Sequence, residues 1–201
     1  MEKESLMAMA VIIIISLVTG ALAGAGVSYY LSNQEKSQDS LIKEFYEIEN
    51  AVHVSPHGLR IKMSKNDSNF TLVDLRSPEE YAREHIKGAI NIPAYKDEET
   101  PDYNAERLIF QFSQLSKDRD IIVYCYSTPC MTGRKIGKIL AEEEIYVKHL
   151  GIGWNEWRYA WTSWNHEYEW NITNVSDYIE IGNLSYGNYT SVCSLSSALG
   201  C

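Results

Sequence analysis

Two cysteines in the second half of the chain are the residues best suited to covalent chemistry. Cys125 directly follows the apolar run of residues 121–124, and Cys130 lies in the short loop behind it. Such a run predicts a buried strand of a parallel sheet, and these sheets bind ligands at the carboxyl ends of their strands. Loop N–H groups and a helix N-terminus there would lower a thiol pKa. We therefore predict that Cys125 is the catalytic nucleophile, against the alternative of an inert buried cysteine.

The loop after Cys125 would bind an anionic sulfur through its backbone N–H groups, as anion-binding nests do. Arg134 could approach an anionic donor or could point to solvent. Cys130 could resolve a persulfide or sulfenate on Cys125 by forming a disulfide, or could be a loop residue that points into the core. The expected loop site is Tyr126, Ser127, Thr128, Cys130, Met131 and Arg134.

Asp74 and Arg76 end another predicted strand near the same edge of the sheet. We expect Asp74 to accept hydrogen bonds from loop N–H groups, and only secondarily to tune the site. Ser77, Pro78 and Glu80 have the order of a helix capping box, which favours a capping role for Glu80. The histidines and carboxylates show no metal-ligand spacing, so we expect no metal and no other cofactor.

Apolar runs and helical patterns alternate along the chain and predict the architecture that positions these residues. Strands are expected at residues 51–54, 71–75, 88–93, 120–125 and 145–150, and helices at 56–63, 77–85, 105–115, 131–144 and 154–164. This alternation predicts an α/β domain with an open parallel sheet flanked by helices. Four tryptophans recur at helical spacing in the last helix (154, 157, 161 and 164), and we expect them to pack in the core, with a membrane-facing surface as the alternative.

The domain organisation begins with a candidate membrane anchor. Residues 7–31 contain no charged side chain and are about long enough for a helix to cross a bilayer. Ala21-Leu22-Ala23 resembles a processing site, so a cleaved signal peptide and a secreted domain are the alternative. We expect residues 1–6 as a short flank, 7–31 as the transmembrane anchor, 32–50 as a linker, 51–165 as the α/β domain and 166–201 as a polar extension, either packed or loose.

Charge and modification motifs bear on partners and compartment. The net charge of -9 argues against nucleic acid or an anionic membrane surface as a partner. Asn-x-Ser/Thr sites occur at Asn66, Asn69, Asn171, Asn174, Asn183 and Asn188. Because these are glycosylation acceptors outside the cytoplasm, we expect a glycoprotein whose domain is extracytoplasmic. Cys193 and Cys201 could pair in such a compartment.

Three stretches, taken in order, resemble the rhodanese-like (sulfurtransferase) domain family. VDLRSPEEYAREHIKGAINIP (73–93) is similar to that family's Asp-x-Arg, Glu-Tyr, His-Ile, Gly-Ala and Asn-Ile-Pro signature. IIVYC ends at the position of the family's persulfide-carrying cysteine, and HLGIGWNEW (149–157) is similar to its closing Gly-Gly-x-x-x-Trp element. The resemblance covers about residues 51–164. It implies that His85 is structural rather than a general base.

The resemblance implies a membrane-anchored sulfurtransferase that moves a sulfane sulfur from a donor such as thiosulfate, through a Cys125 persulfide, to a thiol acceptor. The loop departs from the usual pattern, because Cys130 stands at the fifth place after Cys125, where an arginine is usual. It is similar to a sub-group of single-domain members with a Cys-x4-Cys loop. The alternatives are a non-catalytic binding module and a thiol–disulfide redox protein that uses both cysteines. A phosphatase-like site is the weakest option, since Met131 stands where its arginine would be.

Overall fold

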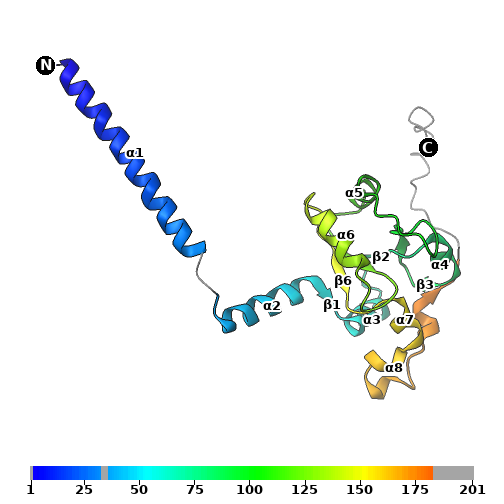
Figure 1. Cartoon of the computed structure of the whole chain (residues 1–201). Helices are drawn as coiled ribbons and strands as arrows, with labels where there is room; N and C mark the ends of the chain where they lie inside the picture. The colour runs from blue at the N-terminus through cyan, green and yellow to red at the C-terminus, as the bar shows by residue number, and fades with distance from the viewer. Residues whose placement is uncertain (1, 33–35, 183–201) are drawn as a thin grey trace, which may run out of the picture. The chain divides into compact units, whose positions relative to one another are not determined.

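The computed structural model describes residues 2–32 and 36–182, and it divides into two compact units between Glu47 and Ile48 (Figure 1). The first unit contains helix α1 (Glu2–Ser32). Its segment Leu6–Tyr30 is 25 residues long, is not buried by any other part of the protein, and is apolar enough to cross a membrane by length and composition. A signal sequence passes the same test, so both sequence expectations for this segment stay open.

Helix α2 (Gln38–Val52) corrects the prediction of a strand at residues 51–54. Ala51 and Val52 belong to this helix, and strand β1 contains only His53 and Val54. Apolar residues recur along α2 at helical intervals, at Leu41, Phe45, Ile48 and Val52, and this period extends the helix through Val52. The expected linker at 32–50 is therefore mostly helical in its described part.

A five-stranded sheet with all neighbouring strands parallel confirms the predicted α/β architecture. Its order is β1-β6-β5-β2-β4, with β2 at Phe70–Asp74, β4 at Ile90–Asn91, β5 at Asp120–Tyr124 and β6 at Lys148–Leu150. Strand β5 lies at the centre, between β6 and β2. The register pairs Asp74 with Tyr124, so β2 and β5 end side by side at the same edge.

Helices cover both faces of the sheet. The helices of this unit after α2 are α3 (Pro56–Ser64), α4 (Pro78–Arg83), α5 (Ala105–Ser113), α6 (Thr132–Ala141), α7 (Trp154–Tyr159) and α8 (Trp161–Trp164). Val73 and Val123 face the cluster that contains side chains of α5 and α6, whereas Leu72 and Ile122 face the cluster that contains side chains of α3, α4 and α7. Because strand side chains alternate between faces, one apolar run fills both cores.

The Trp-rich helix expected at residues 154–164 is interrupted at Ala160, whose φ of -122° and ψ of 39° separate α7 from α8. The break is accompanied by an aromatic cluster. Trp157 is fully buried and stacks on Trp164 at a ring-centroid distance of 4.8 Å, and Trp161 stacks on Tyr178 at 5.5 Å. Aromatic packing inside the protein, as predicted, accounts for three of the four tryptophans here, and Trp154 is also buried.

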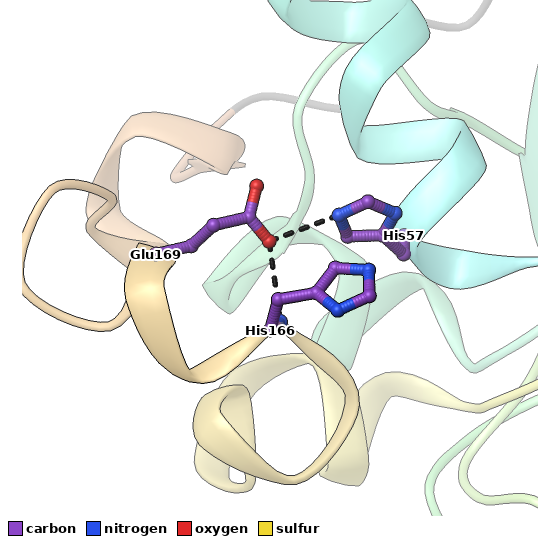
Figure 2. A group of neighbouring side chains, drawn as sticks. All are labelled: His57, His166 and Glu169. Carbon is purple, nitrogen blue, oxygen red and sulfur yellow. Dashed lines mark hydrogen bonds and ion pairs between the residues drawn. The ribbon is translucent and has the colours of Figure 1, made fainter.

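The described part of the C-terminal extension packs on the domain. Strand β7 (Ile179–Glu180) pairs antiparallel with β3 (His85–Ile86), two short strands that the sequence analysis did not predict. Two 3-10 helices precede β7 in the extension, η1 (Glu167–Glu169) and η2 (Val175–Tyr178). Glu169 of η1 reaches back to His57 of α3 (Figure 2). Asn183, Asn188, Cys193 and Cys201 lie outside the described residues.

Replacing Leu72 by alanine tests the two-faced core. The side chain is 1% exposed, so we expect Leu72→Ala to lower the free energy of unfolding by about 2–5 kcal/mol, through lost burial and a residual cavity. Urea unfolding of the full chain in detergent, followed by tryptophan fluorescence, measures this change. Ile172→Ala is the control: that side chain is 74% exposed, so its effect should be below about 0.5 kcal/mol. Equal effects would contradict the assigned faces.

Candidate active site

Cys125 and Cys130 lie together at the carboxyl end of the central strand. Cys125 follows β5 directly, and its Sγ is 3.2 Å from the Sγ of Cys130. Both thiols are free, and Cys125 is only 2% exposed, whereas Cys130 is half-buried. The turn that returns the chain is closed by the N–H of Cys130, which donates to the carbonyl of Ser127 at 3.0 Å. The loop therefore presents the second thiol above the first.

The two sulfurs share a small set of hydrogen-bond donors. The N–H of Tyr126 and the hydroxyl of Thr132 lower the pKa of both thiols, and the N–H of Thr132 lowers that of Cys130. Other amides of the loop are occupied elsewhere: the N–H of Thr128 donates to Glu156 Oε1 at 3.1 Å. The set of groups that stabilise a thiolate is therefore smaller than predicted. It includes Thr132 at the start of α6 as well as Tyr126 of the loop.

The thiol pKa values differ from the sequence expectation. The hydrogen bond with Cys130, together with burial, raises the pKa of Cys125 above its ordinary value. The same hydrogen bond lowers the pKa of Cys130 to about 5; burial opposes this change, and the donors of Thr132 and Tyr126 assist it. The prediction of a low pKa at Cys125 is therefore wrong. The two thiols titrate as a coupled pair, and the lower pKa falls on Cys130, which is less buried than Cys125.

The loop is fixed from below by the segment that follows β6. The N–H groups of Trp154 and Asn155 donate to the carbonyls of Cys125 and Tyr126, both at 2.8 Å. Glu156 accepts from Gly153 as well as from the loop. A Cβ on Gly153 would lie 2.1 Å from the backbone nitrogen of Ser127, closer than real contacts allow. Only glycine permits this approach, which gives the Gly–Trp stretch at 153–154 a physical role in the site.

The sequence left open whether Arg134 approaches the site or points to solvent, and the structure shows where its guanidinium lies. Its Nη1 donates to the carbonyls of Cys130 at 3.2 Å and Thr128 at 3.4 Å, so the guanidinium lies back against the loop although it is exposed. Two carbonyls that would otherwise repel an anion are thereby partly neutralised. Met131 is exposed beside this arginine, and its Sδ is 3.9 Å from Nη1.

Thr132 is held in place by two tyrosines. Its Oγ1 lies 3.0 Å from the Tyr95 hydroxyl and 3.3 Å from the Tyr103 hydroxyl. Burial raises the pKa of Tyr95 to about 12, so the phenol stays protonated at neutral pH. Sequence reasoning missed Thr132, Tyr95 and Tyr103. Their only signal is the position of Thr132 at the start of the helix after the cysteines, since both tyrosines lie in a charged loop without a recognisable pattern.

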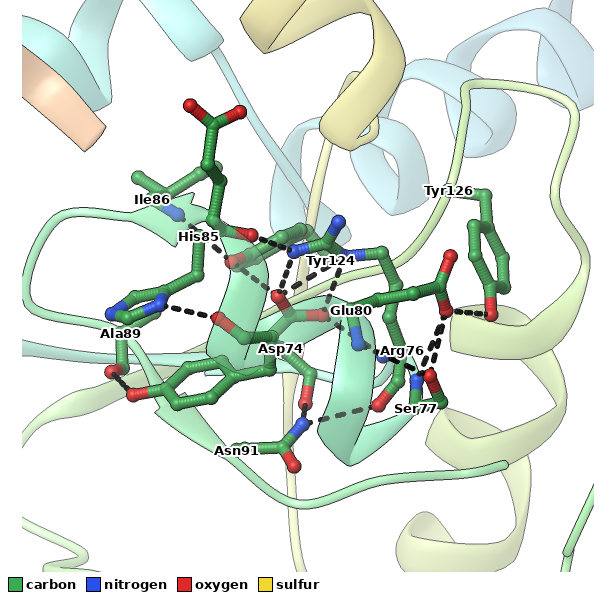
Figure 3. A network of polar contacts seen from close by, with 12 residues as sticks. Asp74, Arg76, Ser77, Glu80, His85, Ile86, Ala89, Asn91, Tyr124 and Tyr126 are labelled. Atoms are coloured by element: carbon green, nitrogen blue, oxygen red, sulfur yellow. Dashed lines mark hydrogen bonds and ion pairs between the residues drawn. The ribbon is translucent and has the colours of Figure 1, made fainter. Parts of the chain in front are cut away.

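Asp74 and Arg76 form a buried ion pair beneath the site (Figure 3). Arg76 Nη2 is 2.6 Å from Asp74 Oδ2, and the N–H of Arg76 donates to Asp74 Oδ1 at 2.9 Å, as the sequence analysis expected for a loop amide. Burial opposes the charge on Arg76, but Asp74 outweighs it and raises the pKa of the guanidinium. The Tyr124 hydroxyl donates to Asp74 Oδ2 at 2.7 Å and accepts from the N–H of Ile86 at 3.1 Å.

The structure also settles the roles of Glu80 and His85 as structural. The capping box is present, because Ser77 accepts from the N–H of Glu80 while the Glu80 carboxylate accepts from the N–H of Ser77. The carboxylate of Glu80 also accepts from the hydroxyl of Tyr126, and so ties the helix cap to the active-site loop (Figure 3). His85 Nδ1 lies 2.8 Å from the carbonyl of Tyr81, and the rings of these residues stack.

The predicted site residues divide into three groups, apart from Met131, which is exposed. Cys125, Tyr126, Cys130 and Arg134 lie around the sulfurs or the loop carbonyls, whereas Asp74 and Arg76 support the strand ends below. Ser127 and Thr128 shape the turn, one through its carbonyl and the other through its amide. The arrangement brings two free thiols into contact, a geometry that suits nucleophilic chemistry at sulfur.

Comparison with known proteins gives one family match. The model of the rhodanese-like domain matches residues 55–160, more than half of the 201-residue chain. The HTH-type transcriptional regulator Rv0324 of Mycobacterium tuberculosis is 40% identical over 90 residues. These cover 45% of this chain but 35% of that protein, so the chain matches about a third of its relative's length.

The solved structures to which this chain is similar include those of two bacterial proteins. The BH2092 protein of Bacillus halodurans is 27% identical and has a TM-score of 0.49; the match covers 60% of this chain and 81% of that one. The Rhodanese_3 like domain of the Alr3790 protein from Anabaena sp is also 27% identical, with a TM-score of 0.35, over 44% of this chain and 90% of that one.

The pH dependence of alkylation tests the thiol assignment. Because only the thiolate reacts, the rate at which iodoacetamide labels Cys130 should be half-maximal near pH 5 and should fall as the pH drops further. Mass spectrometry of the labelled peptide over a pH series measures this. Cys125→Ala removes the S–H donor, so the midpoint should rise toward the ordinary thiol value of about 8.5. A midpoint near that value in the unmodified protein would contradict the assignment.

Proposed function

Because the chain belongs to the rhodanese-like domain family, we propose that it is a sulfurtransferase that carries a sulfane sulfur on its Cys125/Cys130 pair. The donor is a small sulfane-sulfur compound such as thiosulfate, and the acceptor is a thiol. The observation that carries the proposal is the 3.2 Å contact between the two sulfurs at the carboxyl end of β5. The Cys-x4-Cys spacing of the loop, which resembles that of a sub-group of single-domain members, supports the proposal.

The less buried thiol of the pair, Cys130, is the better entry point for sulfur. Cys130 is more accessible than Cys125, and a thiolate on it accepts from Thr132 and Tyr126. The Cys130 thiolate attacks the outer sulfur of thiosulfate; a new S–S bond forms, the old one breaks, and sulfite leaves with the electron pair. An acceptor thiolate then attacks the outer sulfur of the Cys130 persulfide and regenerates the Cys130 thiolate. Cys125 assists by donating its S–H to Sγ of Cys130 whenever that sulfur is anionic.

A thiol–disulfide reaction is the second candidate, and the same sulfur–sulfur contact favours it. Cys125 can attack Sγ of a Cys130 persulfide, so that a Cys125–Cys130 disulfide forms and hydrosulfide leaves with the proton of Cys125. The sulfane sulfur is reduced and the two cysteines are oxidised. An external dithiol must then return two electrons to reopen the bridge. This route makes Cys125 the resolving thiol, the reverse of the roles expected from sequence.

We also propose that α1 anchors the domain and that the domain lies outside the cytoplasm. The four Asn-x-Ser/Thr sites within the described residues have exposed asparagines, at Asn66, Asn69, Asn171 and Asn174. Exposure is what a glycosylation acceptor requires. The apolar length of Leu6–Tyr30 supports a spanning helix, and a cleaved signal peptide remains the alternative outcome of the test below.

Sulfur loading distinguishes the two thiols. After treatment of the reduced full chain with thiosulfate near pH 6, we expect a mass gain of one sulfur atom, which is lost on addition of excess thiol. Cys125→Ser should still load, whereas Cys130→Ser should load at least about tenfold more slowly, because it lacks the exposed thiolate. Loss of loading in Cys125→Ser alone would assign entry to Cys125. No loading in the unmodified protein, with both thiols free, would exclude the sulfurtransferase.

The anchor and the glycans are tested together in the native host. The chain should remain with membranes after alkaline carbonate extraction, and enzymatic removal of N-glycans should increase its mobility on a gel. Asn171→Gln should lower the glycosylated mass by one glycan unit, because that asparagine is exposed. Asn155→Gln, which alters an asparagine outside any acceptor triplet, is the control and should leave the glycosylated mass unchanged. A soluble, unglycosylated chain with an intact N-terminus would contradict both parts.

A further inference from the structure

Two histidines and a carboxylate meet on the side of the domain where the C-terminal extension returns (Figure 2). His57 comes from the first turn of α3, His166 precedes η1, and Glu169 ends η1. One ligand atom from each of the three lies within 4.8 Å of the other two. His57 Nε2 is 2.9 Å from Glu169 Oε2, and the two imidazole rings are 4.4 Å apart, edge to face.

The donor set suits a borderline divalent cation. Two neutral imidazole nitrogens and one carboxylate oxygen are the protein ligands of many zinc sites that keep a fourth position for water. Glu169 is buried, His57 is partly buried and His166 is exposed, so the side of His166 is open to solvent. The ring nitrogens of His166 have no hydrogen-bond partner among residues 36–182; the ring contacts His57 and Tyr168 only through its faces and edges.

Arg60 already contacts the other oxygen of Glu169. Its Nη2 donates to Oε1, while Oε2 faces His57 and the N–H of His166. The carboxylate therefore has one oxygen committed to a buried guanidinium and one directed at the histidines. A cation on Oε2 replaces the proton that His57 shares with it, and Arg60 then acts as a fixed partner that orients the carboxylate. The nearby positive charge lowers the affinity of the site without removing a ligand.

We propose that His57, His166 and Glu169 bind one zinc-class divalent cation, which links the C-terminal extension to helix α3. Local spacing along the sequence gives no sign of this site, because His57 and Glu169 are 112 positions apart in the chain. The site lies apart from the cysteine pair: α3 and the extension pack in the core cluster on the face of the sheet opposite α6. Its expected role is to stabilise the extension, not to take part in sulfur transfer.

Metal titration of the full chain in detergent tests the proposal. Because thiols also bind these metals, the protein should carry Cys125→Ser and Cys130→Ser, and its remaining cysteines should be alkylated. Co²⁺ serves as the probe, since its visible bands report histidine and carboxylate ligands, while thiolate ligands would add an intense near-ultraviolet band. We expect one equivalent to bind, to be displaced by Zn²⁺, and to raise the melting temperature.

Two single variants and one matched control decide the outcome. His166→Ala removes an exposed ligand, so the apo protein should fold normally, and Co²⁺ affinity should fall roughly tenfold or more, as should that of His57→Ala. His53→Ala alters a histidine whose ring lies near His149 instead, and it should leave the affinity unchanged. Absence of stoichiometric binding in the background protein, or equal affinity in His166→Ala and His53→Ala, would overturn the proposal and leave a hydrogen-bonded cluster only.

Discussion

The site depends on the ion pair and hydrogen bonds of one buried carboxylate, that of Asp74. It closes the ends of the two central strands, because it accepts from Arg76 of its own loop and from Tyr124 at the end of β5. An isolated carboxylate at this depth would be very costly, so the charge of Arg76 and the Tyr124 hydroxyl must be in place together. Tyr124 immediately precedes Cys125, and the network thereby fixes the point where the cysteine loop begins.

Above this base, the contact between Cys125 and Cys130 couples the protonation of the two thiols. Their hydrogen bond and burial raise the pKa of Cys125, whereas the same hydrogen bond lowers the pKa of Cys130, the less buried of the two. On the function proposed above, Cys125 is the protonated partner of the Cys130 thiolate. A second thiol in the loop thus changes the electrostatics of the first, while the five-stranded parallel sheet is kept.

Much of the fold, and less of the site, was predictable from sequence. Apolar runs at 71–75 and 120–125 gave the two central strands, since fully buried strands show uninterrupted hydrophobicity. The capping box at Ser77 and Glu80 gave the start of α4. The two-residue strands β3 and β7 carry no pattern, and their pairing joins segments far apart in the chain. The direction of the Cys125 pKa shift could not be predicted for a similar reason. The shift depends on a 3.2 Å contact with Sγ of Cys130, which sequence spacing does not specify.

The antiparallel pairing of β7 with β3 has a consequence for where this protein ends as a folding unit. The match to the family ends at residue 160, within the aromatic cluster, and Trp161 and Trp164 lie beyond it. A fragment cut at that boundary would uncover Trp157 and leave Arg60 in the interior without its counter-ion. The region that matches the family and the packed structure therefore differ in length in this chain, and a fragment that keeps these contacts extends through Glu180.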